Sequence, residues 1–259
     1  MIALHSATGK LVWHFQFTPH DMHDWDSNQT PILTEISFKG KKRKVICWAN
    51  RNGFYNVLDR ITGELLTGIP FAEQNWATGL DPNGRPIPTS RNEASATGQL
   101  ISPSFAGGTN WQNPALDQAK GSFFVHATDG AAVFTKSAAP SRRDIEKGPF
   151  LSSFGYNPEI PKVVLRALDV GTDAKKWETF SPPIINGLPY SYSRLLATGG
   201  GLVFAGSGGY EFALDSETGH VLWRVFVGGD TRAAPISFTV NGKQVIAVSA
   251  GHSFFLFGL

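Results

Sequence analysis

The stretch Ala213-Leu214-Asp215-Ser216-Glu217-Thr218-Gly219-His220-Val221-Leu222-Trp223 decides the fold, because related stretches recur along the chain. Copies occupy residues 3–13, 57–67 and 167–177, the last with Thr172-Asp173 in place of Thr-Gly. In each copy an apolar pair ends a predicted strand, and the polar residues after it favour a tight turn. A Trp ends three of the four copies. Its large apolar ring is suited to packing between sheets.

The spacing of the copies predicts a β-propeller. Their starts are 54, 110 and 46 residues apart, so we expect a degenerate copy inside the long step, near Asn113–Phe124. A period of roughly 40–55 residues with strand-turn-strand signals is typical of four-stranded propeller blades. We therefore predict an all-β fold of the β-propeller type for this chain. The alternative is an unrelated all-β protein in which Thr-Gly turns are common.

Composition agrees with short strands and aromatic packing. The chain has 259 residues, with 28 Gly, 16 Pro, 19 Phe and 7 Trp, and a formal net charge of +2. This charge predicts no nucleic-acid partner. The basic run Lys39–Lys44 lies between apolar stretches, so we interpret it as a solvated hairpin turn. The chain has no run of about 18 apolar residues, so we predict no membrane span.

The cysteine count and the first residues say little about compartment. The single Cys47 excludes an internal disulfide, and its apolar surroundings in the sequence predict a buried thiol. Met1-Ile2-Ala3 runs straight into the first copy, so we expect no signal peptide in this chain.

Two segments are candidates for a binding site. Asn50-Arg51-Asn52-Gly53 lies between apolar runs and predicts a hairpin turn, with the Arg51 guanidinium pointing out of the sheet. Taken alone, such an Arg is usually a solvated surface group. The segment Gly107-Gly108-Thr109-Asn110-Trp111 combines glycines, which allow close backbone approach to a flat partner, with an amide and an indole that can bond and cover it.

A third segment, Thr18–Asp26, carries three Asp and two His within seven residues. Zinc sites use these residue types, but no second cluster with ligand spacing accompanies the segment. We therefore favour a hydrogen-bonded loop over a metal site. The sequence also has no nucleophile elbow, dinucleotide fingerprint or phosphate-binding loop.

With these residues laid out, the chain resembles the PQQ-dependent (quinoprotein) alcohol dehydrogenases of the methanol and ethanol dehydrogenase type. The resemblance covers nearly the whole chain, which looks like the C-terminal half of an eight-bladed propeller. It implies that residues 1–259 form a single incomplete propeller domain of four to five blades. The segments that carry it are Ala3–Trp13, Thr18-Pro19-His20-Asp21, Asn50-Arg51-Asn52-Gly53, Leu58-Asp59-Arg60, Gly107–Trp111, Leu196–Phe204, Ala213–Trp223 and Gly242-Lys243-Gln244.

The resemblance implies oxidation of an alcohol by pyrroloquinoline quinone (PQQ) with the help of calcium. It implies that Arg51 lies beside the quinone oxygens, that Asn110 contacts the cofactor and that Trp111 neighbours the pocket. It also implies an electron acceptor such as a cytochrome c, and a periplasmic location for the full-length parent.

The chain departs from the family pattern in several places. In the family, the catalytic Asp, the calcium ligands, a vicinal disulfide and a Trp that stacks on PQQ lie upstream of the segment matching Ala3–Trp13. We therefore expect no catalytic residue and no metal ligand in this chain, and no activity by the chain alone. His23 stands where the family often has Trp, and Tyr190-Ser191-Tyr192-Ser193 replaces a Trp-Gly-Gly connection. Open blade edges would favour self-association.

Two alternatives stay open from the sequence. The first is a non-catalytic PQQ-like propeller that serves as an interaction scaffold, as in outer-membrane assembly lipoproteins, which share the repeat. The Arg51 turn and the Gly107–Trp111 segment favour the enzyme lineage, because a scaffold needs neither. The second is a sugar-oxidising relative.

Overall fold

The computed structural model describes residues 1–136, 152–154, 161–172, 174–180 and 194–258. These residues form β-strands and turns, with one short 3-10 helix, η1 (Ser90–Asn92). The all-β prediction is confirmed. None of the helical structure in the described residues is long and apolar enough to cross a membrane.

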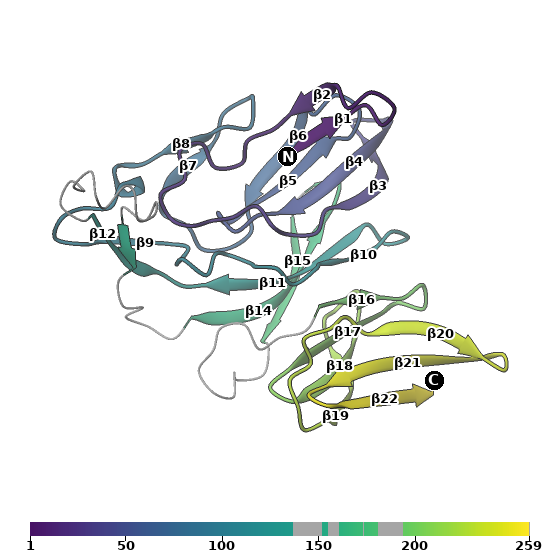
Figure 1. Ribbon diagram of the computed structural model, residues 1–259. Helices are drawn as coiled ribbons and strands as arrows, with labels where there is room; N and C mark the ends of the chain where they lie inside the picture. The colour runs from purple at the N-terminus through teal and green to yellow at the C-terminus, as the bar shows by residue number, and fades with distance from the viewer. Residues whose placement is uncertain (137–151, 155–160, 173, 181–193, 259) are drawn as a thin grey trace. The chain divides into compact units, whose positions relative to one another are not determined.

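The strands assemble into antiparallel sheets (Figure 1). The four-stranded sheets have the orders β3-β4-β5-β6, β10-β11-β14-β15 and β16-β17-β18-β19. Their strands are β3 (Ile32–Phe38), β4 (Lys41–Ala49), β5 (Phe54–Asp59), β6 (Leu65–Pro70), β10 (Ala115–Asp117), β11 (Ser122–Asp129), β14 (Lys162–Asp169), β15 (Lys175–Phe180), β16 (Leu196–Ala197), β17 (Leu202–Ser207), β18 (Tyr210–Asp215) and β19 (Val221–Phe226).

The smaller sheets have two or three strands in the described residues, with the orders β1-β2, β7-β8, β13-β12-β9 and β20-β21-β22. Their strands are β1 (Ile2–Leu4), β2 (Leu11–His14), β7 (Ala77–Leu80), β8 (Pro86–Pro88), β9 (Gln99–Ile101), β12 (Ala132–Lys136), β13 (Ser152–Phe154), β20 (Ile236–Val240), β21 (Lys243–Ala250) and β22 (Ser253–Gly258).

The chain divides into two compact units. The first unit comprises residues 1–27, 49–109 and 128–162, and the second comprises residues 28–48, 110–127 and 163–259. The first has an aromatic core that includes Trp25, Phe54, Trp76 and Phe134. The second has one core around Phe124, Val203 and Leu214 and another around Phe204 and Ile246. The prediction of a single incomplete domain stays a prediction.

All four predicted copies of the repeat form the same local structure. Each is an antiparallel hairpin, made by β1–β2, β5–β6, β14–β15 and β18–β19. In every one the register shifts within the apolar pair before the turn, for example between Ala213 and Leu214. In the three later copies an aspartate follows this pair and organises the turn, as where Asp215 Oδ1 accepts the N–H groups of Glu217 and Thr218. In the first copy His5 takes this place. The same sequence signal therefore produces the same bulge and turn each time.

The predicted degenerate copy near Asn113–Phe124 forms a hairpin, and this hairpin differs from the other copies in its place within the sheet. Ala115–Asp117 does form a hairpin with β11, but it makes the first two strands of its sheet. The copies in the other four-stranded sheets make the last two. The copies that start at residues 57 and 167 are far apart because segments are inserted between β6 and β10 and between β11 and β14. These segments contain the strands of the small sheets β7-β8 and β13-β12-β9.

The repeated Trp packs on the turn of the next copy. An added Cβ at Gly63 would come within 2.7 Å of the Trp13 ring, and one at Gly219 within 2.5 Å of the Trp177 ring. Both glycines have positive φ, so the turn conformation and the close approach both require glycine. Each indole also donates a hydrogen bond to a turn carbonyl, Trp13 to Arg60 and Trp177 to Ser216.

Trp223 lies in a different environment from the other two. Its ring is 37% exposed and packs edge-on against Phe257 of β22, with ring centroids 5.0 Å apart. Cys47 is buried, as predicted. The basic run Lys39–Lys44 forms a turn only at Lys39 and Gly40, because Lys41–Lys44 belong to β4, so that interpretation is confirmed in part.

Candidate functional site

The turn Asn50–Gly53 connects β4 to β5 and is buried, although all four residues are polar or glycine. Asn50, Arg51 and Asn52 are at most 6% exposed. The Gly53 N–H donates to the Asn50 carbonyl, and the Asn50 N–H donates to the Phe54 carbonyl, which confirms the predicted hairpin turn. The Asn52 amide reaches back 3.0 Å to the Phe17 carbonyl. Buried polar groups need such partners, so the turn is held in one conformation.

Two tryptophans of the first unit hold the surroundings of this turn. Trp76 Nε1 donates to the Asn52 carbonyl at 2.8 Å, and Trp25 Nε1 donates to the Ser104 carbonyl at 2.9 Å. The two rings pack against each other, with centroids 5.2 Å apart. Large rigid rings with satisfied N–H groups make a firm support for the turn.

The Arg51 guanidinium is buried, so the reading of this residue as a solvated surface group is wrong. Its side chain is 8% exposed, and the Nη2 group donates to the Phe105 carbonyl. The Nη1 group lies 3.4 Å from Asp26 Oδ2. The Nε–H is buried and has no hydrogen-bond partner. The guanidinium is therefore fixed at two nitrogens and carries a third donor that is unsatisfied, which costs free energy unless a ligand accepts from it.

Gly107 and Gly108 lie against this hairpin. An added Cβ at Gly107 would come within 2.7 Å of Arg51 Cβ, and one at Gly108 within 3.1 Å of the Gly53 Cα. The Gly108 N–H donates to the Arg51 carbonyl. The interpretation that this pair makes room for a flat partner is therefore corrected: the space beside the glycines is filled by the Arg51 turn.

The acidic segment before β3 is a hydrogen-bonded loop, as predicted. Asp21 Oδ1 accepts the His23 N–H and Asp21 Oδ2 accepts the Trp25 N–H, both at 2.8 Å. Burial raises the pKa of Asp21, although these hydrogen bonds and the Arg51 charge act in the opposite direction. The described residues contain no group of three or more His, Cys, Asp or Glu side chains placed to hold a metal ion.

His23, which stands at a position where Trp was expected from the resemblance, takes up an aromatic role. Its ring stacks on Trp25 with centroids 4.1 Å apart and meets Phe134 edge-on at 5.1 Å. Burial lowers the pKa of His23 to about 4, and the backbone of Asn92 opposes this shift. The imidazole is therefore neutral at pH 7 and substitutes for an aromatic ring in the support beneath Arg51.

Comparison with known proteins connects this geometry to a family. Residues 1–91 match the family described as glucose/ethanol/alcohol dehydrogenase, beta-propeller domain. Residues 161–257 match a second family, outer membrane protein assembly factor BamB.

Individual relatives match nearly the whole chain. Quinohemoprotein alcohol dehydrogenase ADH-IIG of Pseudomonas putida is 32% identical, over 97% of this chain and 36% of that protein. The 1-butanol dehydrogenase (cytochrome c) of Thauera butanivorans is 31% identical, over 97% of this chain and 37% of that protein. The crystal structure of the Comamonas testosteroni quinohemoprotein alcohol dehydrogenase matches with a TM-score of 0.86 at 29% identity, over 98% of this chain and 38% of that one.

The resemblance to the quinoprotein alcohol dehydrogenases is confirmed. The described sheets are those of a β-propeller of the quinoprotein type, and they form part of one. The chain spans 36% to 42% of the length of the first relatives that it matches, so it corresponds to a fragment of these dehydrogenases.

The other residues expected at a quinoprotein cofactor site, Asn110 and Trp111, belong to the second unit. Asn110 is 6% exposed, and its side-chain oxygen accepts the Trp111 N–H at 2.9 Å. The Trp111 ring carries the Arg194 guanidinium 5.5 Å from its centroid. A shared pocket of Arg51, Asn110 and Trp111 therefore stays a prediction. The replaced connection at residues 190–193 lies outside the described residues.

Sequence reasoning missed three residues that the structure adds near the candidate cofactor-binding residues. Phe105 contributes only its backbone carbonyl, which no sequence pattern reveals. Asp26 was part of the acidic segment but not singled out as the partner of Arg51. Gln112, in the second unit, is 2% exposed, and neither of its amide atoms has a hydrogen-bond partner. Its place directly after Asn110-Trp111 was the available signal.

Proposed function

We propose that the chain is part of a PQQ- and calcium-dependent dehydrogenase that oxidises alcohols, and that it contributes one side of the cofactor pocket. Arg51, Asn110 and Trp111 are the cofactor-binding residues of this proposal. The observation that carries it is the Arg51 guanidinium, buried at a strand connection and left with one unsatisfied N–H. The matched relatives are named as alcohol dehydrogenases, which supports the same class of reaction.

The residues present fit the quinone. A buried cation that still has a donor to offer suits a group that brings oxygen acceptors. Such a charge has to be held in place, and the Phe105 carbonyl and Asp26 do this from the other nitrogens. The support from Trp25, His23 and Trp76 beneath the turn keeps the guanidinium from rearranging when the ligand is absent.

When bound, PQQ supplies the electron-accepting chemistry of the reaction. Arg51 would place a fixed positive charge where negative charge develops on an oxygen, which stabilises that charge most strongly in a site that excludes water. Asn110 would offer its amide as a second polar contact, and Trp111 would cover an edge of the site. We assign the role of proton acceptor to none of these residues, so it has to come from elsewhere.

The remaining parts of the proposal rest on the family resemblance. Calcium would be bound by ligands outside the residues of this chain, and an external acceptor such as a cytochrome c would take the electrons. The parent protein would be periplasmic. Because the relatives are longer, we propose that the chain alone is inactive and that residues 1–259 form one incomplete propeller domain with edges open to self-association.

The experiment that tests the cofactor site is a titration of PQQ, with calcium present, into the chain and into a version extended to the full length of its relatives. Tryptophan fluorescence reports binding, and alcohol-dependent dye reduction reports activity. We expect Arg51→Met to weaken PQQ binding by about a hundredfold, because it removes a charged hydrogen bond in a buried site. Arg85→Met is the matched control, since Arg85 is exposed in the same unit. Equal affinity in both variants would refute the assignment of Arg51.

A second candidate function is a non-catalytic scaffold that binds other proteins. The match of residues 161–257 to the BamB family favours it. A scaffold has no use for a buried cation with an unsatisfied donor, which is why we rank it second. If neither the chain nor its extended version binds PQQ while both remain folded, the scaffold becomes the better proposal.

A further inference from the structure

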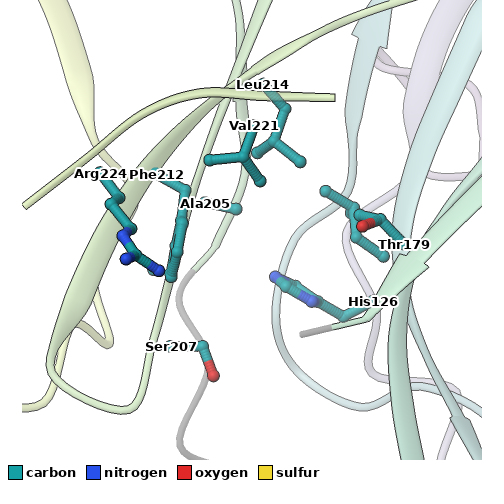
Figure 2. Close-up of a pocket in the computed structure, with 10 residues that line it drawn as sticks. His126, Thr179, Ala205, Ser207, Phe212, Leu214, Val221 and Arg224 are labelled. Carbon is teal, nitrogen blue, oxygen red and sulfur yellow. The ribbon is translucent and has the colours of Figure 1, made fainter. Parts of the chain in front are cut away.

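A cavity in the second unit has no part in the proposed cofactor site. It has a volume of about 210 Å³ and lies between the sheet β10-β11-β14-β15 and the sheet β16-β17-β18-β19. Figure 2 shows Arg224 and Phe212 on one side and His126 and Thr179 on the other. For scale, an apolar cavity of about 150 Å³ holds a benzene molecule. The space is therefore sufficient for one aromatic ring and a small substituent.

The strand register explains why most of this lining is apolar. Ala205, Phe212 and Arg224 are paired across β17, β18 and β19, so they form one row on the same face of the sheet. Leu165 of β14 lies on the opposite wall. Ala205, Phe212 and Leu165 are at most 7% exposed and belong to the core of this unit. An apolar ring placed here would replace water with close contacts.

The polar groups of the lining can all donate hydrogen bonds. They are the Arg224 guanidinium, the Thr179 and Ser207 hydroxyls and the His126 imidazole. No acidic side chain stands among the described residues of the lining. In the described part of the chain, no ion pair involves Arg224. The cavity thus offers a positive charge at an apolar surface.

Two acidic residues on the strands that line the cavity, Glu178 of β15 and Glu211 of β18, face away from it. Glu178 is paired with Arg166, one residue along from the Leu165–Thr179 pair, and so lies on the opposite face of its sheet. Glu211 is paired with Gly206, one residue along from the Ala205–Phe212 pair. It too projects from the other face. Neither carboxylate therefore neutralises Arg224 within the cavity.

From this arrangement we propose that the cavity is a binding site for a small aromatic or branched monocarboxylate, about the size of benzoate. The ring lies between Phe212 and Leu165, and the carboxylate accepts from the Arg224 guanidinium. Planar pairing of a guanidinium with a carboxylate gives both strength and orientation. The proposal is independent of the alcohol dehydrogenase function, because it uses none of the residues assigned to that site.

Binding to the 259-residue chain by isothermal titration calorimetry tests the ligand class. Benzoate, benzamide and benzamidine share one shape and differ in charge. We expect benzoate to bind at least about tenfold more tightly than benzamide, because a charged hydrogen bond is lost in the amide. Benzamidine should bind most weakly, because its cation meets Arg224. Equal affinities for benzoate and benzamide, or no binding of benzoate at millimolar concentration, would overturn the proposal.

Two variants locate the site. Arg224→Met should remove the preference for benzoate over benzamide. Because Arg224 is exposed, we expect this variant to fold. Arg232→Met is the control, because Arg232 is an exposed arginine of the same unit that pairs with Asp230 at 3.0 Å. Ala205→Leu should abolish binding of both ligands by filling the cavity, with circular dichroism to verify the fold. If both arginine variants weaken the binding of benzoate equally, the binding depends on the net charge of the protein and not on Arg224, and the proposed site is refuted.

Discussion

Two turns occupy corresponding places in two four-stranded sheets and are built in opposite ways. Asn50–Gly53 joins the second and third strands of the sheet β3-β4-β5-β6, and Gly208-Gly209 joins the second and third strands of β16-β17-β18-β19. The first is a buried polar turn with an arginine inside it. The second is a plain pair of glycines with φ of 58° and 80°. The fold can therefore close this position with no side chain at all.

The comparison shows that Arg51 is not required to form the hairpin. Burying a guanidinium costs desolvation free energy, which the Phe105 carbonyl and Asp26 offset only in part, because one N–H stays unsatisfied. A residue that the architecture does not need and that is costly to bury is a functional candidate. This difference between the turns is the strongest structural argument for a ligand at Arg51.

The two turns also differ in the state of the ionisable side chain that lies in or near each of them. The Arg51 guanidinium has two hydrogen-bond partners, the Phe105 carbonyl and Asp26. Glu211, two residues past Gly209, is fully buried, and neither carboxylate oxygen has a hydrogen-bond partner. Burial raises the pKa of Glu211 to about 8, so this side chain is protonated at pH 7. The first buried polar group is therefore paired with acceptors, whereas the second is neutralised by protonation.

The largest expected effect comes from adding a side chain to Gly107, which packs against the first turn. Gly107→Ala would place a Cβ 2.7 Å from Arg51 Cβ and 2.8 Å from the Thr109 carbonyl oxygen, at a φ of +82°. We expect a loss of about 4 kcal/mol or more in the free energy of unfolding. Gly209→Ala, at a φ of +80° but 3.1 Å from the flexible Phe226 side chain, should cost only about 1 kcal/mol. Urea denaturation measures both, and equal losses would contradict the comparison.

Next in size is the pH dependence that Glu211 imposes. With its pKa raised to about 8 in the folded state, the folded protein binds a proton that the unfolded protein releases above pH 4.5. Stability should therefore fall as pH rises from about 4.5 to 8. Glu211→Gln should remove this slope and be more stable than the parent at pH 9 by several kcal/mol.

Urea denaturation between pH 5 and 9 checks this prediction, with Glu217→Gln as the control at an exposed glutamate of the same unit. Parallel curves for the parent and the Glu211→Gln variant would show that Glu211 is ionised at neutral pH in the folded protein.

A smaller effect should follow from weakening the support of the Arg51 turn. Trp76→Phe keeps most of the ring but removes the N–H that reaches the Asn52 carbonyl at 2.8 Å. We expect a loss of about 1 to 2 kcal/mol in stability, since a buried carbonyl loses its donor. The effect on PQQ affinity should exceed that of a surface control, because the position of Arg51 depends on this turn. A variant with normal stability would mean that the indole N–H is not needed there.

The smallest effect is expected at Asp26. Its side chain is 66% exposed and lies 3.4 Å from Arg51, so the pair is well screened by water. Asp26→Asn should change stability by less than about 0.5 kcal/mol. Such a result in thermal denaturation would show that the Phe105 carbonyl, rather than Asp26, holds the guanidinium. A loss above about 2 kcal/mol would give Asp26 the larger share.

The elements that depend on local chemistry could be predicted from the sequence. The turn at Asp215–Gly219 needs an aspartate, a threonine and a glycine in order, and all of these are neighbours in the chain. The hairpin at Asn50–Gly53 arises from its own four residues in the same way. Such signals can be read without knowing the rest of the fold.

Other features depend on residues far apart and could not be read this way. The burial of Arg51 requires the Phe105 carbonyl, 54 residues along the chain. The place of Ala115–Asp117 in its sheet depends on the insertion after β11, which interrupts the order of the strands without changing the local pattern. Gln112 and Glu211 became visible only as buried groups without partners.

The contact of each tryptophan with the next turn along the chain gives the repeat a direction. Trp13 reaches forward to the turn at Gly63, and Trp177 reaches forward to the turn at Gly219. Each of these contacts joins the Trp at the end of one copy to the glycine turn of the following copy, so the copies pack only in head-to-tail order. Trp223 packs on Phe257 instead, and in the described residues it has no Thr-Gly turn of a following copy to contact. A further copy of the repeat engineered to pack on Trp223 would have to present its Thr-Gly turn to the ring. A copy added in the reverse orientation would not make this contact.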